Sequence, residues 1–137
     1  MGEAKKVLVV DDERGIRLLL SDVLSGRGFH VSLAKDGLES LEKLETDDFD
    51  LVVTDINMPR LDGLEMLKSM EKKGRREKVI IMTADPSDKR LLETKMPRVV
   101  SRLFKPFGIE GFLDVVIAAT SVDKNMGGGG LRQAAAI

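Results

Sequence analysis

The sequence of 137 residues contains no cysteine and only one histidine, His30. The lack of cysteine excludes a disulfide framework, a thiolate zinc site and a cysteine nucleophile, and it is compatible with a reducing compartment. One histidine cannot form a histidine metal cluster, and a catalytic triad would have to be built on it alone. We therefore interpret His30 as the first residue of a strand and look for chemistry among carboxylates, hydroxyls and amines.

Long apolar runs and a strong charge of one sign are also missing. No stretch approaches the roughly 20 apolar residues of a membrane span. Only four apolar residues follow the pair Lys5 and Lys6, whereas the core of a signal peptide needs at least about seven. Lys and Arg number 22 and Asp and Glu number 23, so no global positive field attracts nucleic acid or anionic lipid. We expect one cytoplasmic domain that contacts neither nucleic acid nor a membrane.

Apolar spacing predicts five strands that alternate with five helices. Short runs rich in β-branched residues predict strands at residues 7–10, 30–34, 51–53, 79–82 and 103–104. Apolar residues at helical spacing predict helices at residues 16–24, 38–44, 64–70, 86–96 and 108–122. This alternation is typical of the α/β class. We predict a single doubly wound (βα)5 flavodoxin-like domain, with helices on both faces of a five-stranded parallel sheet of order 2-1-3-4-5.

The end of the chain differs in composition from the rest. Residues 123–137 include four consecutive glycines followed by a short stretch that is rich in alanine. Glycine-rich segments of this kind behave as flexible chain. We therefore assign residues 1–122 to the domain and interpret residues 123–137 as a flexible tail or the start of a linker.

Four of the predicted strands end on polar residues. Asp11 and Asp12 follow the first strand, Asp55 ends the third, and the fourth and fifth lead into Thr83 and Lys105. Because ligand sites of parallel α/β sheets lie at the carboxyl ends of the strands, we expect these side chains in one place. Each has a simpler interpretation alone, since a pair of aspartates after a strand is usually solvated or faces a helix N-terminus. The combination is what points to a site.

Three carboxylates at such short range are unstable without a cation. Two unit charges about 4 Å apart repel by about 4 kcal/mol at an effective dielectric constant of about 20. Oxygen ligands without histidine or cysteine favour Mg²⁺, shared with water and a phosphoryl group. An ammonium and a hydroxyl beside the metal suit the charge on a transferring phosphoryl group. We therefore predict that Asp55, at the centre of the array, is a nucleophile that becomes an acyl phosphate.

The sequence resembles the receiver domain of bacterial two-component response regulators over about residues 5–122. The resemblance is carried by Val-Val-Asp11-Asp12-Glu13, by Asp55-Ile-Asn-Met-Pro-Arg-Leu-Asp-Gly63, by Thr83-Ala84 and by Lys105-Pro106-Phe107. It implies a Mg²⁺-dependent phosphoryl transfer to Asp55 from the phosphohistidine of a histidine kinase or phosphotransfer protein, or from a small acyl phosphate such as acetyl phosphate. It also implies a regulatory phospho-acceptor and not an enzyme in the usual sense, although receivers catalyse their own phosphorylation and dephosphorylation.

The same resemblance assigns roles around the expected metal. Asp12, Asp55 and the backbone carbonyl of Asn57 would bind Mg²⁺ directly, and Asp11 would act largely through water. Lys105 would pair with the phosphoryl oxygens. These roles agree with the chemistry expected from the residue types alone.

Further positions would sense or tune the phosphorylated state. By the resemblance, Thr83 would swing to hydrogen-bond the phosphoryl group, and the small Ala84 would leave room beside it. Receivers tune the phosphoryl lifetime at the second residue after the phospho-acceptor and the second after the threonine, which are Asn57 and Asp85 here. An amide and a carboxylate can help to orient an attacking water, so we predict a modest lifetime.

One position departs from the family pattern. Receivers that signal through threonine and an aromatic residue carry Tyr or Phe three residues before the lysine, whereas this chain has Arg102 there and no tyrosine at all. Arg102 is either an exposed charge on an edge strand, which would limit aggregation, or a partner for an acidic protein or a neighbouring receiver. The last helix is apolar on more than one face, so a homodimer or output surface that includes it and Arg102 is an alternative to burial against the sheet.

The sequence leaves three functions open. The first is a stand-alone receiver or phosphorelay shuttle whose phosphorylation controls binding to another protein. The second is the regulatory module of a longer transcription factor or enzyme, whose output domain would lie outside this chain. The third is an independent Mg²⁺-dependent phosphohydrolase, which is disfavoured because the chain has no Walker-type glycine-rich loop with a lysine for a nucleotide.

Overall fold

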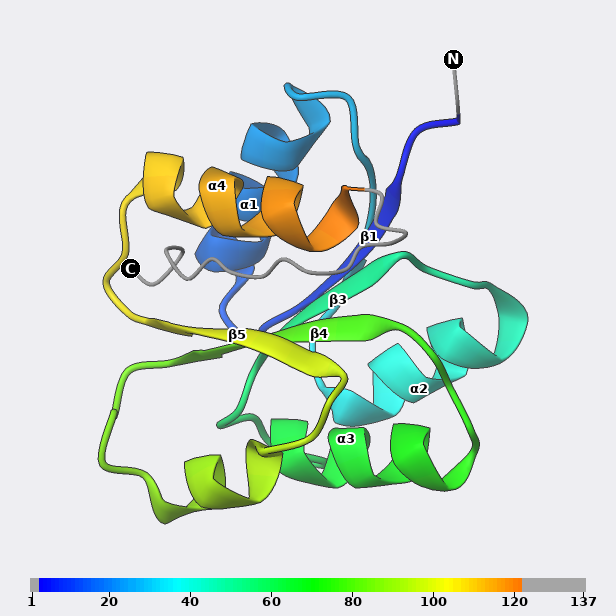
Figure 1. Cartoon of the computed structure of the whole chain (residues 1–137), viewed down its shortest axis with the longest axis vertical. Helices are drawn as coiled ribbons and strands as arrows, with labels where there is room; N and C mark the ends of the chain where they lie inside the picture. The colour runs from blue at the N-terminus through cyan, green and yellow to red at the C-terminus, as the bar shows by residue number, and fades with distance from the viewer. Residues whose placement is uncertain (1–2, 122–137) are drawn as a thin grey trace.

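Five parallel strands form one sheet in the computed structural model, which describes residues 3–121 (Figure 1). The strands pair in the order β2-β1-β3-β4-β5, which confirms the predicted topology. Their bounds are β1 Lys6–Val10, β2 His30–Ala34, β3 Leu51–Asp55, β4 Lys78–Thr83 and β5 Val99–Phe104. His30 opens β2, as predicted from the sequence, and β5 begins earlier than predicted.

Within residues 3–121, four α-helices cover the two faces of the sheet. They are α1 Arg14–Ser25, α2 Gly37–Thr46, α3 Gly63–Lys72 and α4 Ile109–Thr120. Helices α1 and α4 lie on one face, and α2 and α3 lie on the other (Figure 1). None of these helices is long and apolar enough to cross a membrane.

The central strand β1 is covered on both sides. Val7 and Val9 belong to the core that α1 and α4 share with the sheet, whereas Leu8 and Val10 belong to the core under α2 and α3. All four side chains are fully buried. Successive residues of a strand point to opposite faces, so a continuous apolar run is what a doubly covered strand requires.

The register of the sheet brings the strand ends level with one another. Val10 lies beside Thr54, Asp55 lies beside Met82, and Thr83 lies beside Phe104. Side chains that follow β1, β3, β4 and β5 therefore meet at one edge of the sheet.

Helices α2 and α3 begin at aspartate N-caps. The side chain of Asp36 accepts a hydrogen bond from the backbone N–H of Glu39 at 2.9 Å, and Asp62 and Glu65 form a reciprocal capping box. Each such cap stabilises a helix by about 1 kcal/mol. The caps therefore define where α2 and α3 leave the loops at the carboxyl edge.

The predicted fourth α-helix, residues 86–96, is wrong. The structure has a 3-10 helix of six residues there, η1 Lys89–Thr94. The residues before it form a turn, because the backbone N–H and the hydroxyl of Ser87 both donate to the carboxylate of Asp85, at 2.9 and 2.6 Å. Leu92 is 66% exposed, so the segment buries too little apolar surface to support an amphipathic α-helix.

Helix α4 buries most of the apolar residues that suggested a second apolar face. Ile117 is 39% exposed, but the larger part of the run is buried against α1 and the sheet, namely Phe112, Leu113, Val115, Val116 and Ala119. Burial against the sheet therefore accounts for most of this run, and a partner surface on α4 stays a prediction. The predicted tail, residues 123–137, lies outside the described residues.

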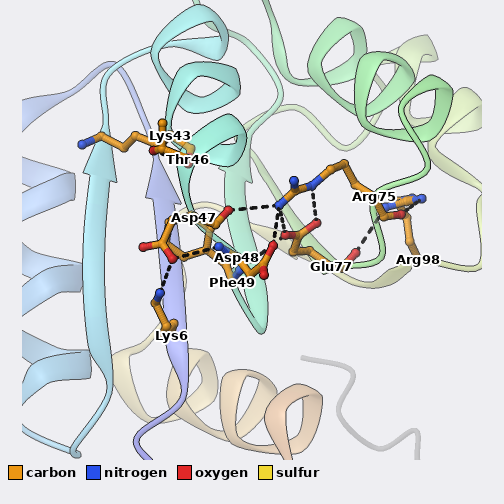
Figure 2. A network of polar contacts seen from close by, with 9 residues as sticks. All are labelled: Lys6, Lys43, Thr46, Asp47, Asp48, Phe49, Arg75, Glu77 and Arg98. Atoms are coloured by element: carbon orange, nitrogen blue, oxygen red, sulfur yellow. Dashed lines mark hydrogen bonds and ion pairs between the residues drawn. The ribbon is translucent and has the colours of Figure 1, made fainter.

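Charged side chains join the strand starts at the opposite, amino edge of the sheet (Figure 2). The Nε atom of Arg75 donates to Glu77 Oε1 at 3.1 Å, and its Nη2 atom donates to the backbone carbonyl of Asp47 at 3.1 Å. Lys6 pairs with Asp47, and the guanidinium of Arg98 donates to the backbone carbonyl of Arg75. These contacts tie together the segments that lead into β1, β3, β4 and β5.

Candidate functional site

Three carboxylates gather at the carboxyl edge of the sheet. Asp11 and Asp12 follow β1, Asp55 is the last residue of β3, and one carboxylate oxygen from each lies within 4.8 Å of the others. Asp11 is fully buried and Asp55 is 7% exposed, whereas Asp12 is exposed to solvent. The structure thus brings together the three aspartates that the sequence places at strand ends.

Lys105, in the loop after β5, supplies positive charge to this cluster. Its Nζ atom donates to Asp11 Oδ2 at 2.9 Å and to Asp55 Oδ2 at 3.1 Å. Burial alone would lower the pKa of Lys105, but its contacts with Asp11 and then Asp55 raise the pKa above its ordinary value. Lys105 is therefore an ammonium, and one ammonium faces three carboxylates. The cluster keeps an excess of negative charge.

The environment of Asp55 makes its carboxylate more basic than a solvated one. Burial is the largest influence and raises the pKa of Asp55, whereas Lys105 and the backbone N–H of Asn57 lower it and the charge of Asp11 raises it. The net result is a raised pKa. A cation bound beside the carboxylate would act in the opposite direction, because a nearby positive charge favours the ionised form.

The end of β4 places a hydroxyl beside the cluster. Thr83 is 2% exposed, and its Oγ1 atom accepts a hydrogen bond from the backbone N–H of Asp85 at 3.1 Å. Ala84, between them, is exposed. The hydroxyl is therefore present at the carboxyl edge and engaged within its own loop.

A cavity of about 530 Å³ opens beside the carboxylates. It is lined by residues from four strand ends and from η1: Asp12, Glu13, Asp55, Asn57, Thr83, Ala84, Asp85, Asp88, Arg90 and Lys105. The sequence motifs and the two lifetime-tuning positions, Asn57 and Asp85, include all of these except Asp88 and Arg90. Those two carry no sequence signal, because their segment has the pattern of an α-helix and no motif places one of its residues opposite Asn57.

Arg90 reaches from η1 to the loop that follows Asp55. Its Nη1 atom donates to Asp62 Oδ2 at 3.1 Å, and its Nη2 atom donates to Asn57 Oδ1 at 3.2 Å. Asp88 holds the same guanidinium through Nε to Oδ1 at 3.1 Å and Nη2 to Oδ2 at 2.7 Å. These hydrogen bonds from Arg90 keep the pKa of Asp88 below its ordinary value, so the pair stays charged.

The loop at residues 56–62 is fixed on its other side by the start of α2. Arg60 donates from Nε to Asp36 Oδ2 at 2.7 Å, and the backbone N–H of Gly37 donates to the carbonyl of Leu61 at 3.0 Å. A Cβ atom added to Gly37 would lie 2.3 Å from that carbonyl oxygen, so a glycine is required for this approach. Two arginines therefore hold the loop: its own Arg60 binds Asp36 at the start of α2, and Arg90 of η1 binds Asn57.

Arg102 lies outside the cavity. It is on the edge strand β5, and its guanidinium donates from Nε to Thr94 Oγ1 at 2.9 Å and from Nη2 to the carbonyl of Thr94 at 2.7 Å. The side chain of Arg102 thus binds the last residue of η1. The sequence suggests either an exposed edge charge or a contact with another protein, and neither interpretation includes this internal contact. A contact of Arg102 with a partner stays a prediction.

The parallel α/β sheet, the acidic cluster and the lysine at its carboxyl edge are together typical of the receiver class of signalling domains. The family model described as the response regulator receiver domain matches residues 7–117. The chain therefore belongs to the response regulator receiver domain family.

Known relatives agree with this assignment. Sporulation initiation phosphotransferase F of Bacillus subtilis is 37% identical over 112 residues, which cover 82% of this chain and 90% of that protein. Response regulator MprA of Mycobacterium ulcerans is 38% identical over 108 residues, which cover 79% of this chain and 47% of that protein. The chain thus spans about half the length of MprA.

Solved structures have the same fold. Chemotaxis response regulator CheY4 of Vibrio cholerae superimposes with a TM-score of 0.78 at 31% identity, covering 85% of this chain and 98% of that chain. Response regulator TrrA of Thermotoga maritima, solved in complex with Mg²⁺ and beryllium fluoride, gives a TM-score of 0.76 at 33% identity, covering 84% and 98%. The described fold therefore matches both structures over nearly their whole length.

Proposed function

We propose that Asp55 accepts a phosphoryl group from the phosphohistidine of a histidine kinase or phosphotransfer protein, or from a small acyl phosphate. The observation that carries this proposal is the Lys105 ammonium, which bridges Asp11 and Asp55 and lines the cavity beside them. An ammonium at hydrogen-bond distance from the attacking oxygen is also placed to neutralise the oxygens of the incoming group.

The chain's own residues divide the work of the transfer. A carboxylate oxygen of Asp55 attacks phosphorus, and the bond between phosphorus and the donor nitrogen or oxygen breaks. Lys105 then pairs with the phosphoryl oxygens. Thr83 leaves its contact with Asp85 and donates its hydroxyl to the phosphoryl group, and Ala84 leaves room for that group.

The donor set fits a hard divalent cation, for which we propose Mg²⁺. Asp11 is fully buried, and its oxygens accept hydrogen bonds from the backbone N–H of Glu13 at 2.9 Å and from Lys105. We infer that Asp11 acts largely through water. The exposed Asp12 and the terminal strand residue Asp55 are the carboxylates that hold the ion, together with the backbone carbonyl of Asn57. When bound, Mg²⁺ supplies positive charge that offsets the charge of the phosphoryl oxygens.

The product is a signalling state, and the protein is a regulatory phospho-acceptor that catalyses only its own phosphorylation and dephosphorylation. Asn57 and Asp85 line the cavity and set a modest lifetime for that state. Phosphorylation changes the surface offered to an output partner or a second copy of the chain, on the face that includes Arg102. A regulatory module within a longer protein is a second candidate, favoured by the match to about half of MprA. The cytoplasmic location stays a prediction.

Phosphorylation of the intact protein by acetyl phosphate tests this function. We expect the full chain to gain the mass of one phosphoryl group in Mg²⁺ and to gain none when the metal is removed with EDTA. Asp55→Ala should abolish the gain. Asp114→Ala, which removes an exposed carboxylate on α4, is the matched control and should label like the unchanged protein.

The outcomes separate three accounts. No added mass in the unchanged protein, together with no response to beryllium fluoride, would contradict the phospho-acceptor function. Labelling of Asp55→Ala at the normal level would show that another carboxylate is the acceptor. Rapid turnover of an unrelated phosphate ester would instead support a phosphohydrolase.

A further inference from the structure

Arg90 is the only arginine among the residues that line the cavity. Its side chain is 31% exposed, and the contacts of its guanidinium leave that group little freedom to reorient. Asp88 binds it through two parallel hydrogen bonds, and Asp62, the N-cap of α3, accepts a hydrogen bond from the third nitrogen. Bidentate arginine–carboxylate pairs fix the orientation of the guanidinium plane. Arg90 is therefore held in a fixed orientation in the lining of the cavity.

The contact that matters for chemistry is the one with Asn57. A side-chain amide has one oxygen that accepts hydrogen bonds and one NH₂ group that donates them. Nη2 of Arg90 donates to the side-chain amide oxygen of Asn57 at 3.2 Å. The backbone N–H of Asn57 donates to Asp55 Oδ1 at 3.3 Å. Arg90 thus occupies the accepting end of the Asn57 side chain.

Loss of the phosphoryl group requires water in that region. The oxygen of the water attacks phosphorus, the bond from phosphorus to the Asp55 oxygen breaks, and the Asp55 carboxylate is regenerated. One proton of the water stays on the inorganic phosphate and the other goes to solvent. A nearby hydrogen-bond acceptor orients the attacking water by accepting one of these protons as a hydrogen bond.

We propose that Arg90 is a positioning residue that prolongs the phosphorylated state by holding the side-chain oxygen of Asn57 away from the attacking water. The proposal rests on the phospho-acceptor function of Asp55. Without Arg90, the amide oxygen of Asn57 is free to accept a hydrogen bond from water, and hydrolysis accelerates.

The test compares dephosphorylation rates of the full chain after phosphorylation with acetyl phosphate and removal of the donor. Arg90→Ala should lose inorganic phosphate about three- to tenfold faster than the unchanged protein, the factor expected for one hydrogen bond. Phosphorylation should not become faster in this variant. Lys89→Ala removes an equal charge from the exposed neighbour on η1 that lies outside the cavity, and it should not change either rate.

A double-mutant cycle distinguishes positioning from a structural effect. If Arg90 acts through the amide of Asn57, Arg90→Ala should have no effect on dephosphorylation in the Asn57→Ala background. Equal or slower hydrolysis in Arg90→Ala, an equal change in both rates, or an undiminished effect in the Asn57→Ala background would each overturn the proposal. Failure of the unchanged protein to become phosphorylated at all would instead overturn the function of Asp55.

Discussion

Gly63 leaves no room for a side chain between the start of α3 and the end of β3. Its backbone N–H donates to the carbonyl of Ile56 at 2.9 Å, which holds the start of α3 against the end of β3. A Cβ atom added there would lie 2.4 Å from the backbone oxygen of Asp55 and 2.8 Å from the Cα atom of Ile56. Atoms in a packed interior do not approach so closely, so a larger residue must displace either α3 or the proposed phospho-acceptor.

We expect Gly63→Ala to lower the free energy of unfolding by about 1–3 kcal/mol and to slow phosphorylation of Asp55. Gly15→Ala makes the same change in α1, where no atom lies within 4 Å of the added Cβ. That control should be neutral or stabilising by up to about 1 kcal/mol. Urea denaturation of the two variants measures the difference, and equal effects would contradict the steric explanation.

The site residues differ in how far the sequence determines them. Asp11, Asp55 and Lys105 could be predicted as site residues, because sequence periodicity shows where each parallel strand ends and these residues stand at those ends. The contact between Arg90 and Asn57 depends on how a loop and a short 3-10 helix fold over that edge. Such contacts between distant segments have no local pattern, so only the structure shows them.

Among the elements, η1 depends most on side chains outside itself. Its apolar burial is partial, since Leu91 packs against the core under α2 and α3 whereas Leu92 is exposed. At its end, Arg102 donates two hydrogen bonds to the buried Thr94 from the neighbouring strand. The sequence pattern of Leu91 and Leu92 resembles that of an α-helix, whereas these tertiary contacts and the Ser87 turn favour a shorter element. This is why the strands were predictable and η1 was not.

Loss of the Arg102 contact should loosen η1 while the sheet stays intact. We expect Arg102→Ala to increase hydrogen exchange at the backbone amides of residues 89–98 by about tenfold, because two charge-assisted hydrogen bonds are lost. Val100→Ala shortens an exposed side chain on the same strand and should leave exchange in η1 unchanged. Hydrogen exchange read by mass spectrometry checks both, and slow exchange in Arg102→Ala would show that other contacts hold Thr94.

The molecule as a whole uses the two edges of its sheet differently. The carboxyl edge gathers like charges around the site, with Asp11, Asp12 and Asp55 facing one lysine. The amino edge pairs opposite charges, with Arg75 at the centre of the network (Figure 2). Repulsion between carboxylates at the carboxyl edge destabilises the fold, whereas ion pairs at the amino edge stabilise it.

Glu77 is the buried member of the amino-edge network. Its side chain is 5% exposed and binds Arg75, while Phe49 donates a backbone N–H to it at 3.4 Å. Burial alone would raise the pKa of Glu77, but the hydrogen bonds from Arg75 and from backbone N–H groups outweigh it, so the pKa lies below its ordinary value. The ionised form is therefore the one that stabilises the fold.

The sign of the pH dependence follows from that shift. Because the pKa of Glu77 is lower in the folded state than in the unfolded chain, where it is about 4.3, its stabilisation is complete above that value and is lost as the pH falls through the folded pKa. We expect Glu77→Gln to lower the free energy of unfolding by about 1–3 kcal/mol at neutral pH and by less at about pH 3. Asp48→Asn, which alters a 97% exposed partner of the same arginine, should have little effect at either pH. Urea denaturation at both pH values measures the difference, and a loss in Glu77→Gln that is as large in acid as at neutral pH would show that its charge contributes nothing.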